Sequence, residues 1–206
     1  STVPKAARAL RPRHRRQYCT LMPRQNLTRE RVVAAAIKLG DTGGAEALTL
    51  GNLARALGIQ TPSLYKHIAS LTDLHDEIGV RGARLLAARL IALPRGGDPT
   101  EVLLQACMVY RTFAAEHPTH YRSLQPTLVK RGADFRAAAE ELLGAIFPLV
   151  DAVGVEQKNL VHAVRGLRSF LHGFADLEAV GGFGLPGEVN ESYRFALGVY
   201  IAGLRH

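Results

Sequence analysis

Apolar residues recur at intervals close to one helical turn from about residue 28 to the end of the chain, and this periodicity dictates the class of fold. It is clearest in one short segment, at the spacing i, i+3, i+4 and i+7: Leu50, Leu53, Ala54 and Leu57. Thr49 stands directly before this segment as a helix cap, and Thr28 stands before an apolar series that ends near residues 43–44. No segment shows the alternation of a half-buried strand convincingly. The sequence therefore predicts an all-α protein.

A break rich in proline and glycine at residues 94–99 divides the predicted helices into two groups. Before it, short helices lead to a longer one that begins at the cap Ser70. After it, long helices are predicted over about 100–116, 133–153 and 155–180, with a last helix from the cap Asn190 to Leu204. Eleven of the thirteen Phe and Tyr residues lie after residue 106, which indicates a small front module and a larger bundle. The predicted organisation is a basic, disordered tail (1–25), a front domain (26–72) and a larger helical domain (73–206).

The formal net charge of +8 comes mostly from the predicted tail. Residues 1–25 carry seven Lys or Arg and no acid, whereas residues 72–206 carry fourteen basic and fifteen acidic residues. The tail lacks the apolar stretch of a signal peptide, and Met22 is an alternative start directly before the first helical segment. No apolar run approaches the ~18 residues that a membrane span needs. Two cysteines cannot form a disulfide framework, so we expect a cytoplasmic protein with no membrane partner.

The segment from residue 50 to residue 67 has the residues that a helix-turn-helix requires. Such a motif needs a small residue where its helices touch, a residue free to turn the chain, and an apolar anchor under the second helix. Ala54, Gly58 and Leu64 supply these in order. A plain helical hairpin uses the same residues, but the second helix here (61–67) is short and polar. Helices of that kind lie in the major groove of DNA, so the segment favours a DNA-binding domain.

One stretch, LARALGIQTPSLYKHI at residues 53–68, resembles the DNA-binding domain of the tetracycline-repressor (TetR) family. Its most specific part is Leu64-Tyr65-Lys66-His67-Ile68, which follows the Leu-Gly pair at 57–58 at the spacing of that family. The resemblance covers about residues 27–75. It implies an all-α homodimer with an N-terminal three-helix helix-turn-helix DNA-binding domain and a C-terminal helical-bundle ligand-binding and dimerisation domain, usually acting as a repressor.

A second resemblance, within residues 165–184, is to the TetR regulators whose C-terminal domain is named for a Trp-His-Gly tripeptide. Leu171-His172-Gly173 stands at the place of that tripeptide, with Leu instead of Trp. Glu178 and the glycine-rich residues 181–184 follow it as in those regulators. This resemblance indicates a sub-group and says nothing of the effector.

The TetR resemblance assigns DNA contacts to residues of the front domain. Four are expected to face bases, with Gln60 directly before them: Thr61, Pro62, Ser63 and Lys66. Four are expected to donate hydrogen bonds to phosphates: Thr28, Thr49, Tyr65 and His67. The family usually has a Ser or Thr cap where Gln60 stands, so Thr61 is expected to take over the cap. The family often has a phosphate-binding Lys where Leu71 stands, so we expect weaker contact with the DNA backbone there.

Each of these assignments has a structural alternative. Tyr65 is also compatible with a core position, Lys66 with a merely solvated charge, and His67 with a cap of its short helix. Thr28 and Thr49 are helix caps in either case, and DNA contact is a second use of the same hydroxyl.

The larger domain has candidate residues for an effector pocket. An apolar lining is predicted from Met108, Phe113, Tyr121, Phe147 and Phe170, since sites between bundle helices are mostly apolar. Arg168 and His172 are candidates for a polar group of the effector. The alternatives are that the apolar residues are ordinary core and that His172 simply pairs with Asp176 at i, i+4.

An apolar stripe beside these polar residues predicts the dimer interface. In TetR proteins the two last helices usually pair across the two-fold axis. The residues expected there are Val164, Leu167, Leu171, Phe195 and Val199. A core position is the alternative for the residues of the longer helix.

No catalytic or metal-binding pattern accompanies these features. His117 and His120 flank Pro118 without further clustered ligands, and neither a phosphate-binding loop nor a nucleophile elbow occurs. We therefore expect no enzyme activity, no metal and no cofactor. The sequence favours a repressor dimer that reads a pseudo-palindromic double-stranded DNA operator and is released by a small, largely apolar effector. The alternatives are a small-molecule-binding protein or enzyme with a vestigial DNA module, and a regulator without a ligand.

Overall fold

The computed structural model describes residues 26–125 and 131–204, and every regular element in these ranges is helical. The predicted tail (1–25) lies outside the described residues. The front helices are α1 (Arg29–Gly43), α2 (Leu50–Ala56) and α3 (Thr61–Leu64). The remaining ones are α4 (Leu71–Ile91), α5 (Pro99–Glu116), α6 (Pro118–Ser123), α7 (Ala133–Asp151), α8 (Leu160–Ala179) and α9 (Val189–Gly203). Two short 3-10 turns, Ala45–Ala47 and Gln157–Asn159, precede α2 and α8.

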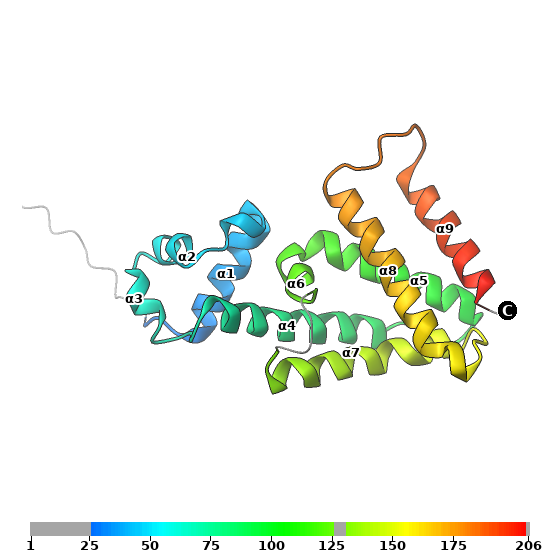
Figure 1. Cartoon of the computed structure of the whole chain (residues 1–206), viewed down its shortest axis with the longest axis horizontal. Coiled ribbons are helices and arrows are strands. Elements are labelled where there is room, and N and C mark those ends of the chain that lie inside the picture. The colour runs from blue at the N-terminus through cyan, green and yellow to red at the C-terminus, as the bar shows by residue number, and fades with distance from the viewer. Residues whose placement is uncertain (1–25, 126–130, 205–206) are drawn as a thin grey trace, which may run out of the picture.

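The front unit, α1 to α3, forms one end of an elongated molecule (Figure 1). Its helices begin at the predicted caps: the Thr28 hydroxyl accepts from the Arg31 amide at 3.3 Å and the Thr49 hydroxyl accepts from the Asn52 amide at 3.1 Å. Gly58 turns the chain between α2 and α3 at a φ of 67°, which favours a residue without a side chain. The all-helical prediction and the helix-turn-helix prediction are therefore confirmed as structure.

Helix α4 belongs to both units. Leu74 and Ile78, in its first two turns, are fully buried in the core of the front unit. Leu86 and Leu90, further along, are buried in the core of the bundle. The predicted domain boundary at 72/73 therefore falls in the first turn of a continuous helix. Periodicity locates a helix and its caps but does not show that two cores share it.

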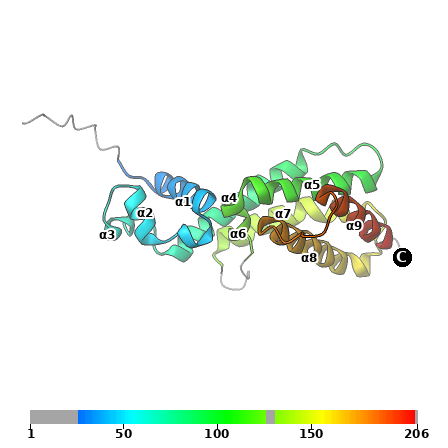
Figure 2. The same cartoon turned by 90° about the horizontal axis from the view of Figure 1, so that it is seen from above.

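The bundle consists of the rest of α4 with α5, α7, α8 and α9, and α7 lies alongside α4 (Figures 1 and 2). Tyr193 and Tyr200 on α9 donate hydrogen bonds to the carbonyl oxygens of Cys107 and Ala163, at 2.7 and 2.9 Å. The prediction that Asn190 caps the last helix is wrong. That helix starts one residue earlier, and the Asn190 side chain accepts from Arg111 at 2.8 Å instead.

The front unit also contacts the bundle through α6. The Thr119 amide donates to an Asp41 carboxylate oxygen at 3.0 Å, and the Thr119 hydroxyl donates to the Ile37 carbonyl at 3.3 Å. A Cβ placed at Gly40 would lie 2.9 Å from the Thr119 methyl group, so α1 and α6 approach too closely for a side chain there. Together with α4, this contact makes two connections between the units.

No helix in the described ranges is long and apolar enough to span a membrane. Within the same ranges, no group of three or more His, Cys, Asp or Glu side chains is arranged to hold a metal ion.

Candidate functional site

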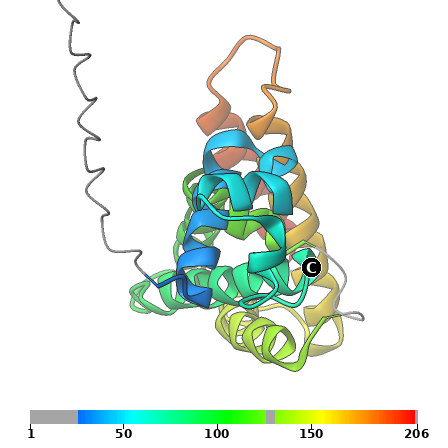
Figure 3. The same ribbon diagram turned by 90° about the vertical axis from the view of Figure 1, so that its left-hand side faces the viewer.

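The outer surface of α3 and of the turn that follows it (65–67) is a polar face at the free end of the molecule, the end that Figure 3 views directly. Tyr65 is 55% exposed, and Pro62 and Lys66 are also exposed. Leu64 is fully buried beneath them as the apolar anchor. A core position for Tyr65 is therefore excluded, and its ring and hydroxyl are available to a partner.

The start of α3 differs from its prediction. Gln60 has the extended backbone of a cap residue, with φ −86° and ψ 146°, and its side chain makes no capping hydrogen bond. The Ser63 amide donates to the Gln60 carbonyl at 2.9 Å, so Thr61 is already the first helical residue. The prediction that Thr61 takes over the cap is wrong, because a cap must precede the first helical residue.

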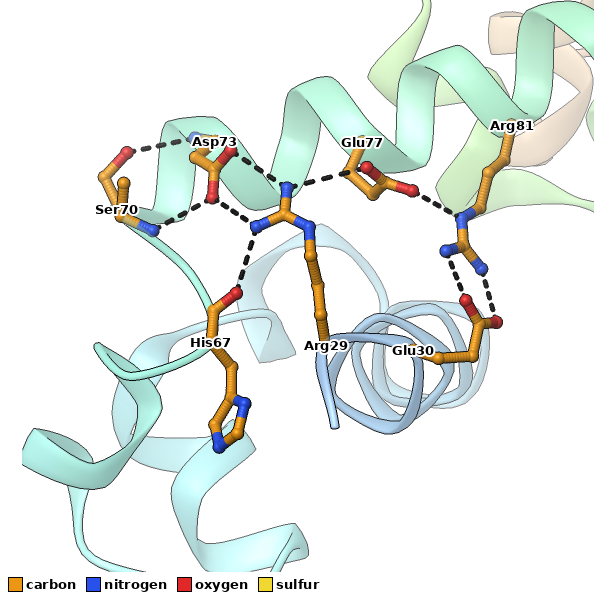
Figure 4. Close-up of polar contacts among 8 residues, drawn as sticks. Arg29, Glu30, His67, Ser70, Asp73, Glu77 and Arg81 are labelled. Carbon is orange, nitrogen blue, oxygen red and sulfur yellow. Dashed lines mark hydrogen bonds and ion pairs between the residues drawn. The ribbon is translucent and has the colours of Figure 1, made fainter. Parts of the chain in front are cut away.

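An arginine outside the predicted DNA contacts anchors α3. Arg29, in the first turn of α1, donates from Nη1 to the His67 carbonyl at 3.0 Å, just beyond the end of α3 (Figure 4). The same guanidinium donates to both carboxylate oxygens of Asp73, at 2.9 and 3.0 Å, and to Glu77 at 3.5 Å. These hydrogen bonds of the Arg29 guanidinium join α1, the end of α3 and α4.

Asp73 is held from two sides. Besides the contacts with Arg29, one of its carboxylate oxygens accepts from the Ala69 amide at 2.9 Å, while its own amide donates to the Ser70 hydroxyl at 3.0 Å. The hydrogen bond with Arg29 lowers the pKa of the Asp73 carboxyl and raises the pKa of the Arg29 guanidinium. The predicted cap at Ser70 is confirmed. Asp73, whose amide binds this cap, also holds the end of α3 in place through Arg29.

A second arginine extends this network along α4. Arg81 donates to Glu77 at 2.9 Å and, through both terminal nitrogens, to the two carboxylate oxygens of Glu30 at 2.6 Å each (Figure 4). Glu30 belongs to α1, so α1 and α4 are joined by ion pairs over about three turns of α4. Motion of α4 is therefore expected to carry α1 and α3 with it.

Replacing Arg29 with Met is expected to loosen α3 while keeping most of the side-chain volume. The loss of its hydrogen bonds should cost about 1 kcal/mol, since the guanidinium is partly exposed, and lower affinity for DNA roughly fivefold. Fluorescence anisotropy with labelled duplex DNA measures the change. Arg84→Met is the matched control, because Arg84 is an ion-paired arginine on α4 whose partner among the described residues is Glu141 on α7 and not a residue of the front unit. Equal DNA affinity of the two variants would contradict the anchoring by Arg29.

A cavity of about 430 Å³ lies among α4, α5, α7 and α8. Its lining is almost wholly apolar and includes Leu86, Leu103, Ile146, Val164, Leu167 and Leu171. Tyr110, Gln125 and Arg168 are the larger polar side chains that reach it. Its volume lies within the range of small-molecule sites in proteins.

Only Arg168 among the predicted effector contacts lines this cavity. Four of the predicted residues, aromatic or sulfur-containing, do not line it and pack elsewhere in the core: Met108, Phe113, Phe147 and Phe170. Phe113 is fully buried against Arg89, and Phe170 stacks on Tyr193 and Tyr200. Composition indicated that aromatic residues fill this domain, but the direction of each side chain depends on how its helix is rotated.

Tyr121 and His172 line a second hollow of about 460 Å³, next to the end of α8. The Tyr121 hydroxyl shares a hydrogen bond with His172 Nδ1 and donates to Asp176 at 3.2 Å. His172 Nε2 lies 3.4 Å from the other Asp176 oxygen, so the alternative of an i, i+4 pair is confirmed. Burial raises the pKa of Tyr121, which keeps its hydroxyl protonated. His172 therefore already has two partners within the chain.

The predicted dimer interface divides into two sets. Val164, Leu167 and Leu171 are at most 8% exposed and face the core and cavity of their own chain, so their assignment to a partner surface is wrong. Phe195 and Val199 on α9 are 76% and 60% exposed. Val161 and Leu177 on α8 are also exposed, at 45% and 49%. The apolar stripe of α8 is thus used inside the chain, while α8 and α9 keep other apolar residues at the surface.

Both the bundle and the chain as a whole are similar to known proteins. Residues 103–200 match the family model described as the tetracyclin repressor-like C-terminal domain. The uncharacterized HTH-type transcriptional regulator YobS of Bacillus subtilis is 29% identical over 187 residues, which cover 89% of this chain and 96% of YobS.

Two solved structures share the fold. A TetR variant from Acinetobacter baumannii AYE in complex with minocycline has a TM-score of 0.64 and 24% identity, covering 86% of this chain and 96% of its own. BioQ with its natural double-stranded DNA operator has a TM-score of 0.63 and 22% identity, covering 87% of this chain and 99% of its own. The similarity spans the front unit and the bundle together.

Proposed function

This chain belongs to the tetracycline-repressor (TetR) family of transcriptional regulators, and on that premise we propose that it is a homodimeric, cytoplasmic repressor whose DNA binding is released by a small, largely apolar effector. Its relatives are named as transcriptional regulators, and the same role, rather than an enzymatic one, is proposed for this chain. The observation that carries the proposal is the exposed polar face of α3, held by Arg29 at the end of the molecule.

The face of α3 is suited to read DNA in the major groove. Four residues are proposed to face the bases, with Gln60 beside them: Thr61, Pro62, Ser63 and Lys66. The phosphate contacts are proposed for Thr28, Thr49, Tyr65 and His67. The hydroxyls of Thr28 and Thr49 accept backbone N–H groups, which leaves each O–H proton free to donate to a phosphate oxygen.

A dimer is proposed through the exposed faces of α8 and α9. Phe195, Val199, Val161 and Leu177 supply the apolar surface there. Two-fold symmetry would then present two α3 helices to successive major grooves, about 34–36 Å apart, and would require a pseudo-palindromic operator. BioQ, which is similar in fold, is solved with its operator, and this supports the same docking end.

The effector is proposed to bind in the 430 Å³ cavity. Leu86 and Leu90 on α4 line it, while Asp73 and Glu77 at the start of the same helix hold Arg29. An effector that prefers one position of α4 would therefore shift α1 and α3, and DNA affinity would change by the same factor as effector affinity. A protein with this fold is solved in complex with minocycline, which supports a small-molecule effector.

The test is binding of the purified dimer to the DNA beside its own gene, measured by fluorescence anisotropy with and without Lys66→Ala. Loss of a base contact should cost about 1–3 kcal/mol and relax sequence preference. Lys158→Ala is the control, because Lys158 is exposed in the bundle far from α3. Retention of full sequence preference by Lys66→Ala would reject the assignment of Lys66 to the bases.

The same assay separates a ligand-responsive repressor from a regulator without a ligand. Apolar compounds are first selected by a rise in thermal midpoint and then added to the protein–DNA complex. Release of DNA by compounds that stabilise the protein is the expected result. Stabilisation that never weakens DNA binding would contradict the proposed effector response.

A further inference from the structure

Within the described part of the chain, Arg168 is the one charged residue that lines the 430 Å³ cavity. It lies on α8, one turn before His172, and its side chain is exposed to solvent, so it stands at the cavity mouth. The walls around it are leucine, isoleucine, valine and alanine side chains with Phe135. A cation at the opening of an apolar chamber favours a ligand that carries the opposite charge at one end.

Among the described residues, Arg168 forms no ion pair with a carboxylate, in contrast to two more deeply buried arginines of the bundle. Arg111 pairs with Glu178, and Arg131 pairs with Asp76 at 2.5 Å. His172 is engaged by Tyr121 and Asp176, so Arg168 is the group available to an incoming anion. None of the described residues accepts a hydrogen bond from the Arg168 guanidinium, so its N–H donors are available to a ligand.

Two neutral polar groups accompany it. Burial raises the pKa of the Tyr110 phenol, and hydrogen bonds with Tyr121 and Gln125 and the charge of Arg168 oppose that rise. The phenol therefore stays protonated as a donor near the guanidinium. Tyr110, Gln125 and Arg168 form the polar end of the cavity, and the remaining lining is suited to a hydrocarbon body.

We propose that the effector of this cavity is an amphiphilic anion, in which an apolar chain or ring system fills the chamber and a single carboxylate pairs with Arg168. This inference rests on the proposed function, since it names the chemical class of its effector. A carboxylate accepts two parallel N–H bonds from a guanidinium, whereas an alcohol of the same length leaves the cation without a counter-charge. An amine of the same length places two cations together.

The test uses decanoate, 1-decanol and decylamine as probes of one chain length, with affinity measured by isothermal titration calorimetry on the full-length dimer. Decanoate should bind the unmodified protein at least about tenfold more tightly than either other probe. Arg168→Gln should lower decanoate affinity about tenfold to a hundredfold and leave decanol affinity unchanged within a factor of two. Arg165→Gln is the matched control, because Arg165 is exposed one turn earlier on α8 and does not line the cavity.

Three outcomes would overturn the inference: no binding of decanoate to the unmodified protein, equal affinity for decanoate and decanol, or an equal loss of both in Arg168→Gln. Operator release is measured separately on the same samples. Decanoate that binds through Arg168 without releasing DNA would support the inference and contradict the proposed effector response. Decanol that releases DNA more effectively than decanoate would reject the inference and leave the proposed function standing.

Discussion

Replacing Phe195 with Glu is expected to convert the proposed dimer to a monomer and to lower operator affinity by a factor of about 10²–10⁴. Phe195 is 76% exposed on α9 beside Val199, so the substitution should leave the fold of the chain intact. In a dimer, however, two carboxylates would face each other across the two-fold axis within an apolar contact. Each half-site of the operator would then be bound by a separate monomer, and the gain in affinity from joining two DNA-binding domains in one dimer would be lost. Sedimentation velocity and anisotropy measure the two effects.

The control for this variant is Ile91→Glu. Ile91 is 62% exposed at the end of α4, so the substitution Ile91→Glu removes a comparable apolar surface from a different helix. It should leave both dimerisation and DNA affinity unchanged. A dimeric Phe195→Glu protein with unaltered operator affinity would show that the subunits associate through another surface.

Replacing Gly79 with Leu is expected to lower the free energy of unfolding by about 3–5 kcal/mol. Gly79 lies on α4 where α7 crosses it. Even a Cβ there would lie 2.5 Å from the Phe135 ring and 2.8 Å from both a guanidinium nitrogen of Arg131 and the Ser123 carbonyl. The Arg131 guanidinium stacks 3.8 Å from the centre of the Phe135 ring and is 6% exposed. A leucine would push this arginine away from Asp76, leaving a buried charge without its partner.

Differential scanning calorimetry should record this loss as a fall of roughly 6–20 °C in the thermal midpoint. Gly144→Leu provides the comparison, because Gly144 lies on α7 with nothing within 4 Å of a Cβ built there. That variant should be as stable as the unmodified protein or more so by about 1 kcal/mol, since leucine favours the helix over glycine. Similar midpoints for the two leucine variants would refute the close approach of α4 and α7 at Gly79.

Several features of the fold were predictable because they depend on neighbouring residues. The caps at Thr28, Thr49 and Ser70 lie where the sequence placed them, since a cap and the amide it binds are three residues apart. The turn at Gly58 and the anchor Leu64 also belong to one short motif. Two predicted caps were wrong: Thr61 is already the first helical residue of α3, and Asn190 lies inside α9.

The anchoring of the end of α3 by Arg29 could not be predicted from neighbouring residues in this way. Arg29 and Asp73 are 44 residues apart in the chain. Each is a common residue type in the exposed first turn of a helix, so neither indicates its partner from sequence. Their pairing exists because α1 and α4 cross in the front unit. Arg168 was a candidate effector contact from sequence, but its position at the cavity depends on how α8 is rotated against α4, α5 and α7.

By itself, the sequence determined that this protein is all-helical, where most of its helices begin, and that residues 50–67 form a helix-turn-helix. Tertiary structure alone decided which apolar faces meet inside one chain. Leu167 and Leu171 line the interior of the bundle, while Phe195 and Val199 remain at the surface. The physical reason is that helical periodicity fixes which residues share a face, whereas the packing of other helices decides what covers that face.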